Sequence, residues 1–205
     1  MSIVKLELRK TLKEFYNPPA KLPTLVELPP MKYIMVDGSG EPGGEAFTQA
    51  MSVLYNVAYT MKFRAKKLLK KDYDMMAPEG LWWMEGKTFD MKQRDKWLWT
   101  LMIIVPDFVN YKLFRDSVEE VRKKKNPSGL DLARLETFDE GTSVQIMHIG
   151  PYASEPESIA KLDAYAKDHG YKMVGKHHEI YLGDPRRATP SQLRTIIRHR
   201  VAKVA

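Results

Sequence analysis

The sequence predicts an α+β protein made of two tandem, pseudo-symmetric repeats, each with the order strand, helix, strand, strand. Three observations lead to this fold class. Short apolar segments are bounded by turn residues, longer segments repeat apolar residues at helical spacing, and the order of these segments occurs twice in the 205-residue chain. Such an order favours antiparallel sheets with the helices on one outer face. The other faces of the sheets are expected to form a ligand cleft.

An N-terminal preamble is expected at residues 1–30. Residues 4–16 could form a helix, and five prolines then exclude regular helix and central strand. The first repeat is expected at about residues 31–106. Its elements are a strand at 31–36, a helix at 45–69 with apolar residues along one face, and strands at 81–85 and 97–105.

A charged connecting helix is expected at about residues 109–125, ended by Asn126-Pro127. The second repeat follows at about residues 130–203. Its elements are strands at 132–138 and 141–149, a helix at 156–169 that stops at Gly170, and strands at 177–182 and 195–201. Residues 31–205 are therefore expected to form one domain that contains both repeats.

Charge is unevenly distributed in this basic chain, which has a formal net charge of +7 and an isoelectric point of about 9.4. The last twenty residues contain six basic residues and no acidic one. A second basic cluster ends the helix expected at 45–69, where the helix dipole favours cations. No zinc-finger spacing or helix-turn-helix pattern accompanies these clusters, so a solvated basic surface is favoured over direct nucleic-acid binding.

Composition excludes several other classes of protein. The chain has no cysteine, which excludes disulfides, thiolate metal ligands and a cysteine nucleophile. No segment approaches the ~20 apolar residues that cross a bilayer, and the N-terminus lacks the pattern of a signal peptide. We therefore expect no membrane insertion and a cytoplasmic location.

Two motifs suggest cofactors, and neither is convincing. Gly38, Gly40 and Gly43 match the dinucleotide-binding spacing G-x-G-x-x-G, but Glu41 and Glu45 would place carboxylates where a pyrophosphate binds. A plain strand-to-helix loop is the favoured interpretation. His177 and Glu179 could share one strand face as metal ligands, but sequence reasoning finds no third ligand beside them. No cofactor and no metal are expected.

Aromatic residues give the most informative pattern. All four tryptophans, Trp82, Trp83, Trp97 and Trp99, lie on the last two strands of the first repeat, and Tyr55 and Tyr59 are spaced by four on the preceding helix. In the second repeat, strand alternation places His177, Glu179 and Tyr181 on one face and His178, Ile180 and Leu182 on the other. If Ile180 and Leu182 contact the helix, Glu179 and Tyr181 face the cleft.

An acid among aromatic rings has a specific chemistry. A carboxylate removed from water either keeps its proton or attracts a cation, and ring faces favour cations by roughly 0.5–2 kcal/mol each. Such a site suits flat, lipophilic, cationic ligands. The competing interpretation is that the aromatic residues are core side chains and that Glu179 is exposed, and the residues alone leave it open.

The chain also resembles a known family. Several motifs resemble the GyrI-like small-molecule-binding domain family, and the similarity spans about residues 20–203. They are the closing motif near the C-terminus (residues 178–182, Asp-Pro-Arg-Arg at 184–187, and 193–198), the Gly-Leu-Trp-Trp strand at 80–83 and the segment at 148–152. The family implies paired repeats whose sheets form a cleft. In its multidrug-sensing regulators, an acid on a late strand is the counter-charge for lipophilic cations. This chain shows no helix-turn-helix pattern, so a direct role as transcription factor is not expected.

The resemblance implies two functions for a stand-alone member. The leading prediction is binding of lipophilic aromatic, cationic compounds, and the second is an alternative to it. The other is hydrolysis of the strained cyclopropane ring of DNA-alkylating natural products, with a Glu and a Tyr that activate water. By this resemblance Glu179 is the counter-charge or base and Tyr55 its partner, and the other candidate binding residues are Trp83, Trp99, Tyr59, Tyr152, Tyr181 and His148. The family name also suggests inhibition of a macromolecule such as DNA gyrase, for which the basic C-terminal segment is the only support.

Overall fold

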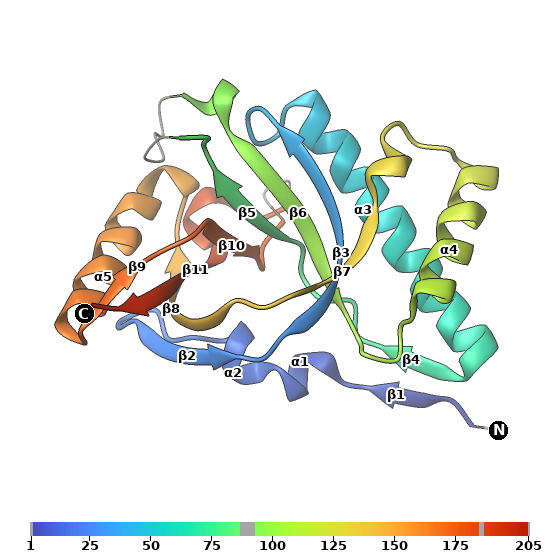
Figure 1. The fold of residues 1–205 in the computed structure, drawn as a ribbon, viewed down its shortest axis with the longest axis horizontal. Helices are drawn as coiled ribbons and strands as arrows, with labels where there is room; N and C mark the ends of the chain where they lie inside the picture. Colours follow the sequence, from blue (N-terminus) through green and yellow to red (C-terminus); the bar gives the residue numbers. More distant parts are fainter. Residues whose placement is uncertain (1, 87–92, 185–186, 205) are drawn as a thin grey trace. The chain divides into compact units, whose positions relative to one another are not determined.

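The chain divides into two compact units in a computed structural model that describes residues 2–86, 93–184 and 187–204 (Figure 1). Unit 1 consists of Met1–Thr11, Met31–Met76 and Trp82–Phe138, and unit 2 consists of Leu12–Pro30, Ala77–Leu81 and Asp139–Ala205. The expected preamble is thus divided between the two units. Pro185 and Arg186 of the closing motif lie outside the described residues.

Unit 1 is built around an antiparallel sheet in which β3 pairs with β6 on one side and with β7 on the other. Helix α3 packs against β3, β6 and the second long helix, α4. A short parallel pair, β1 with β4, lies apart from this sheet. The elements of unit 1 are β1 (Val4–Leu6), α1 (Leu8–Thr11), β3 (Met31–Ser39), α3 (Glu45–Arg64), the π-helical turn η1 (Ala65–Leu69), β4 (Lys71–Tyr73), η2 (Arg94–Lys96), β6 (Leu98–Val105), α4 (Tyr111–Lys124), η3 (Leu130–Leu132) and β7 (Arg134–Phe138).

Unit 2 has an antiparallel sheet in the order β2, β8, β11, β10, and β9 pairs with the far end of β11. Helix α5 packs against β8, β9 and β11. Its core contains Val144, Ile146, Leu162, Ala166, Ile197 and Val201. The elements of unit 2 are α2 (Lys13–Tyr16), β2 (Thr24–Leu28), β8 (Gly141–Ile149), η4 (Tyr152–Ser154), α5 (Glu155–Asp168), β9 (Tyr171–Met173), β10 (His177–Tyr181), η5 (Pro190–Gln192) and β11 (Arg194–Lys203). Strand β5 (Glu79–Trp83) starts in unit 2 and ends in unit 1.

The predicted α+β class and the repeated order of elements are confirmed. The first repeat runs β3, α3, β4, β5, β6, and the second runs β8, α5, β9, β10, β11. The short strand after each helix, β4 or β9, was not predicted because three residues are too few to show an alternating pattern. None of the described helices is long and apolar enough to span a membrane.

The N-terminal helix predicted at residues 4–16 is wrong. Val4–Leu6 instead form β1, which pairs with Lys71–Tyr73. Only two short helices, α1 and α2, follow. A backbone pairing with a segment more than sixty residues away is invisible to local periodicity, and here it overrides local propensity.

The glycine-rich loop of unit 1 connects β3 to α3, as predicted, and accommodates a tryptophan. A side chain added at Gly38 would place its Cβ 2.6 Å or less from three atoms of the Trp99 ring. The Trp99 indole Nε1 donates a hydrogen bond to the Gly40 carbonyl at 3.2 Å, and its ring meets Phe47 edge to face. The glycine at position 38 is therefore required by close approach of a ring.

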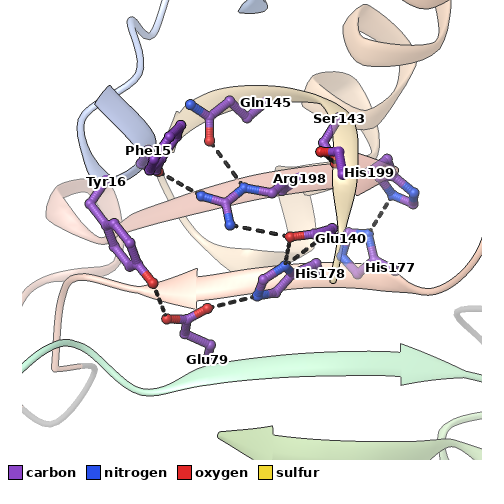
Figure 2. A network of polar contacts seen from close by, with 11 residues as sticks. Phe15, Tyr16, Glu79, Glu140, Ser143, Gln145, His177, His178, Arg198 and His199 are labelled. Carbon is purple, nitrogen blue, oxygen red and sulfur yellow. Dashed lines mark hydrogen bonds and ion pairs between the residues drawn. The ribbon is translucent and has the colours of Figure 1, made fainter. Parts of the chain in front are cut away.

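A buried polar network, the His178 network, joins three chain segments of unit 2 (Figure 2). His178 lies between two carboxyl groups: its Nε2 is 3.0 Å from Glu79 Oε2 and its Nδ1 is 2.9 Å from Glu140 Oε1. Tyr16 of α2 donates its hydroxyl to Glu79 Oε1 at 2.5 Å. All four residues are buried.

Arg198 completes the His178 network from β11. Its guanidinium donates to Glu140 at 3.3 Å, to Gln145 at 3.1 Å and to the carbonyl oxygen of Phe15 at 2.6 Å (Figure 2). Arg198 is fully buried. One of the six basic residues that made the C-terminal segment look like a charged surface therefore belongs to the interior.

The network shifts the pKa of its two central groups in opposite directions. Burial alone would lower the pKa of His178, but the carboxyl groups of Glu140 and Glu79 outweigh burial and raise it to about 9. Burial alone would raise the pKa of Glu140, but His178 and Arg198 outweigh it and lower that pKa to about 2. The imidazolium and the carboxylate therefore stabilise each other.

Substitution of Gly38 by Ala should destabilise the protein, because the new Cβ overlaps the ring of Trp99. Overpacking of this kind typically costs about 1–3 kcal/mol in free energy of unfolding, measured by urea unfolding. Gly38→Ala combined with Trp99→Leu should lose less stability than the sum of the two single variants, because the smaller side chain removes the overlap. Additive losses would contradict this explanation.

The stability provided by His178 should depend on pH. Because its folded pKa lies above the ordinary value of 6.5, its contribution is complete below pH 6.5 and is lost as the pH rises through about 9. The difference in unfolding free energy between wild type and His178→Gln should therefore narrow by about 2–3 kcal/mol between pH 6.5 and pH 9. Urea unfolding at several pH values measures it, and a constant difference would refute the role of His178 as a buried cation.

Candidate functional site

The candidate site lies on the face of β10 that carries His177 and Glu179. Glu179 is paired with Ile197 on β11, and Ile197 with Ile146 on β8, so the three side chains share one face of the sheet. Ile146 and Ile197 pack against α5 as members of its core. Glu179 therefore lies on the helix-covered face, beside the start of α5.

This arrangement corrects one sequence-based expectation. Ile180 was expected to contact the helix, which would have turned Glu179 away from it. Instead Ile180 and His178 occupy the opposite face, where His178 is paired with Arg198 and meets the His178 network. Alternation correctly separated the two faces, but periodicity alone could not say which one the helix covers. Leu182 lies past the end of β10 and is 39% exposed.

Four side chains form the carboxyl–imidazole cluster: Glu155, His177, Glu179 and His199. Glu179 Oε1 is 2.8 Å from His177 Nε2, and His177 Nδ1 is 2.8 Å from His199 Nε2 (Figure 2 shows the two histidines). Glu155, the first residue of α5, is hydrogen bonded through its carboxyl group to Glu179. The cluster is thus a chain of hydrogen bonds that runs from the helix start across two strands.

Protons in the cluster are held asymmetrically. Burial and the charge of Glu179 raise the pKa of Glu155 well above its ordinary value. Burial alone would raise the pKa of Glu179, but hydrogen bonds from His177, Tyr181 and Glu155 lower it. Burial and His177 lower the pKa of His199 to about 3, which keeps His199 neutral. The pKa values of the two neighbouring carboxyl groups are thus shifted in opposite directions.

The aromatic rings of Tyr152 and Tyr181, two of the predicted binding residues, lie beside the cluster. Tyr181 is hydrogen bonded to Glu179, and its ring meets that of Tyr152 edge to face with centroids 6.3 Å apart. Burial and the negative charge of Glu179 raise the pKa of Tyr152 to about 12. Both tyrosines are half-buried, and 14% of the Glu179 side chain is exposed.

His148, another predicted binding residue, is engaged in the turn before α5. Its Nδ1 is 2.9 Å from the Ser158 hydroxyl, and its Nε2 is 3.2 Å from the Pro151 carbonyl oxygen. The side chain is buried. These contacts show His148 connecting β8 to the turn and helix that carry Tyr152 and Glu155.

The remaining predicted site residues belong to unit 1. Tyr55 and Tyr59 stack on each other along α3, with ring centroids 6.3 Å apart, and Tyr59 is 45% exposed. Trp99 is 1% exposed and packs beneath the glycine loop, whereas Trp83 is half-buried at the end of β5. Glu179 belongs to unit 2, so a shared site with these four residues stays a prediction.

Sequence reasoning missed Glu155 and His199. Glu155 precedes Pro156 at the start of α5, where an acid is ordinarily explained by the helix dipole. His199 lies in a basic stretch that suggested a surface. The pairing of β10 with β11 places His199 beside His177. That register could not be derived from the sequence, so His199 could not be found there.

The structure also brings a third potential metal-ligand side chain, Glu155, to His177 and Glu179. Glu155, His177 and Glu179 each offer a donor atom, and these atoms lie within 4.8 Å of one another. Such a group can exchange protons with water or hold a divalent ion. Both uses require the same partly buried corner between α5 and β10.

Solved structures share this fold over nearly the whole chain. An uncharacterized conserved protein from Listeria innocua is 38% identical, with a TM-score of 0.90 over 96% of this chain and 100% of that chain. A hydrolase from Listeria innocua is 38% identical (TM-score 0.89, 97% and 100% covered), and another hydrolase from that organism is 34% identical (TM-score 0.86, 96% and 100% covered). Among curated proteins, none matches the chain.

The family model for the GyrI-like small molecule binding domain matches residues 22–201. That range contains every member of the carboxyl–imidazole cluster and most of the described elements of both units. The resemblance seen in the sequence motifs is thereby confirmed, and the chain belongs to the family of the GyrI-like small molecule binding domain.

Proposed function

We propose that this chain binds a lipophilic electrophile beside Glu179 and hydrolyses it. The observation that carries the proposal is the close approach of the Glu155 and Glu179 carboxyl groups, within 4.8 Å of each other, whose pKa values are shifted in opposite directions. Two carboxyl groups held in opposite protonation states provide a base and an acid at the same place. Two similar solved proteins are described as hydrolases, which is consistent with this chemistry.

Glu179 is the proposed general base. Its side chain is 14% exposed, and His177 Nε2 lies 2.8 Å from one of its carboxylate oxygens. The carboxylate takes a proton from water while the water oxygen forms a bond to an electrophilic carbon of the substrate. A strained ring needs little further activation, because a positioned water and the release of strain lower the barrier together.

Glu155 is the proposed acid. The bond of the substrate that breaks leaves its electron pair on an acceptor atom, and Glu155 donates its proton to that atom. The proton taken up by Glu179 then returns to Glu155 through their hydrogen bond, which restores the starting state. The product equals the substrate plus one water, and no oxidant or reductant is consumed.

The proposed substrates are lipophilic aromatic compounds with a strained cyclopropane ring. The family resemblance implies hydrolysis of such rings in DNA-alkylating natural products. The rings of Tyr152 and Tyr181 lie beside Glu179 and offer apolar surface for a flat ligand. The proposal that Tyr55 acts as partner of Glu179, and that Trp83, Trp99 and Tyr59 contribute walls, is retained from the sequence and awaits the same tests.

The variant Glu179→Gln should lose hydrolysis while keeping the ligand. Removal of a general base typically lowers a rate by about 100- to 10,000-fold. Mass spectrometry of a cyclopropane-bearing alkylating compound should show a product one water heavier with wild type and almost none with the variant, and Glu155→Gln should also be slow. The matched control is Glu157→Gln, an exposed acid two residues further along α5. Equal turnover by Glu179→Gln, or none by wild type, would refute the proposal.

Capture of a lipophilic cation without turnover is the second candidate function. It is favoured by the net negative charge of the Glu155–Glu179 pair next to two aromatic rings. It is less favoured than hydrolysis because His177, Tyr181 and Glu155 already donate hydrogen bonds to Glu179 and satisfy much of its charge.

A fluorescent dye cation separates the two functions. If Glu179 is a counter-charge, Glu179→Gln should weaken binding of the cation by about 10-fold or more and leave binding of a neutral analogue of the dye unchanged. Fluorescence titration measures both affinities. Equal affinity of wild type and variant for the cation would exclude the counter-charge role.

A further inference from the structure

The carboxyl–imidazole cluster has the composition of a metal site. One donor atom from each of Glu155, His177 and Glu179 lies within 4.8 Å of the other two. Protein ligands bind zinc at about 2.0–2.2 Å, so ligand atoms that share one ion lie roughly 3–4 Å apart.

A second, independent feature points to a missing ligand. Among the residues that the structure describes, Glu155 is 3% exposed and its Oε1 is buried without any hydrogen-bond partner. Buried polar atoms are nearly always paired, so an unpaired carboxyl oxygen calls for an explanation. A cation bound at Glu155 would satisfy this oxygen.

The surrounding residues hold the imidazole in a suitable orientation. His177 Nδ1 is hydrogen bonded to His199 Nε2 at 2.8 Å, so Nε2 is the ring nitrogen directed at Glu179. Metal-binding histidines commonly use one ring nitrogen for the ion and hydrogen bond the other to a neighbour, which fixes the ring. His199 would act here as the positioning residue.

The donor set selects the class of ion. Two carboxylates and one imidazole provide oxygen and nitrogen ligands, and the chain has no cysteine to supply sulfur. Imidazole favours zinc and its neighbours among the transition metals over magnesium and calcium. We propose that Glu155, His177 and Glu179 form a binding site for Zn²⁺, with three protein ligands and a further position open to solvent.

This inference goes beyond the proposed function and does not depend on it, because binding is measured without any substrate. Zn²⁺ would replace the proton on Glu155, so the zinc-bound chain is a different state from the one that the proposed hydrolysis uses. Calorimetric titration of Zn²⁺ into the tag-free, chelator-treated chain should give one ion per chain. Co²⁺ at the same site should give a visible absorption band that reports nitrogen and oxygen ligands. Mg²⁺ at the same concentrations should not compete.

Variants test the ligands one by one. Glu155→Gln keeps the size of the protonated carboxyl group, so it should fold, and it should weaken Zn²⁺ binding by at least about 100-fold. His199→Gln should weaken it by about 10- to 100-fold through the loss of the outer hydrogen bond, with the cobalt band altered and not abolished. Glu157→Gln, in the same helical turn but exposed, should bind like wild type.

Several results would overturn the proposal. Absence of Zn²⁺ binding by wild type, or equal binding by wild type and Glu155→Gln, would exclude the site. Equal binding of Mg²⁺ and Zn²⁺ would show that His177 is not a ligand. Should Glu155→Gln fail to fold by circular dichroism, His177→Gln replaces it, and unchanged affinity in that variant would equally exclude the site. Hydrolysis assays run in chelator report on the proposed function separately.

Discussion

The hydrogen bond between Glu155 and Glu179 is the interaction on which the site depends. Two carboxyl groups in a partly buried corner cannot both be ionised without a large cost in free energy, and one proton between them removes that cost. The pair requires the start of α5 to lie near β10. The packing of Ile146 on β8 and Ile197 on β11 against that helix holds it on the sheet, and β10 is paired with β11. Apolar packing thus keeps the carboxyl groups of Glu155 and Glu179 close enough for each to shift the pKa of the other.

Strand β10 carries ionisable groups on both of its faces, which is unusual for a buried strand. On one face His178 is enclosed by Glu79 and Glu140, whose hydrogen bonds occupy both ring nitrogens. On the other face the side chain of Glu179 is 14% exposed, and Oε1 of the neighbouring Glu155 is buried without a hydrogen-bond partner. The closed network therefore serves stability, whereas the open cluster retains protons and surface that a ligand can use. Because side chains alternate along the strand, the adjacent residues His177 and His178 point to opposite faces and take part in different groups of contacts.

Much of the fold followed from the sequence, because amphipathic helices and apolar strands leave periodic patterns. The strands Met31–Ser39 and Gly141–Ile149 and the helix Glu155–Asp168 were located within a few residues. Short strands and the N-terminal segment were missed, since their structure comes from pairing with distant backbone. Within the site, Glu179 stood out as an acid among apolar residues. Glu155 and His199 did not, because only the register of the sheet and the helix start bring them to Glu179.

The His178 network also bears on how unit 2 can be assembled. Its members come from three stretches of chain: Tyr16 before the first repeat, Glu79 from β5, and Glu140, His178 and Arg198 from the C-terminal part. A fragment starting at Asp139 would therefore bury a histidine and an arginine with only one of their two acidic neighbours. During synthesis, the His178 network can form only after β11, which carries Arg198, has left the ribosome. Unit 2 is compact in space, but it consists of three separate segments of the polypeptide, so no continuous fragment contains all of it.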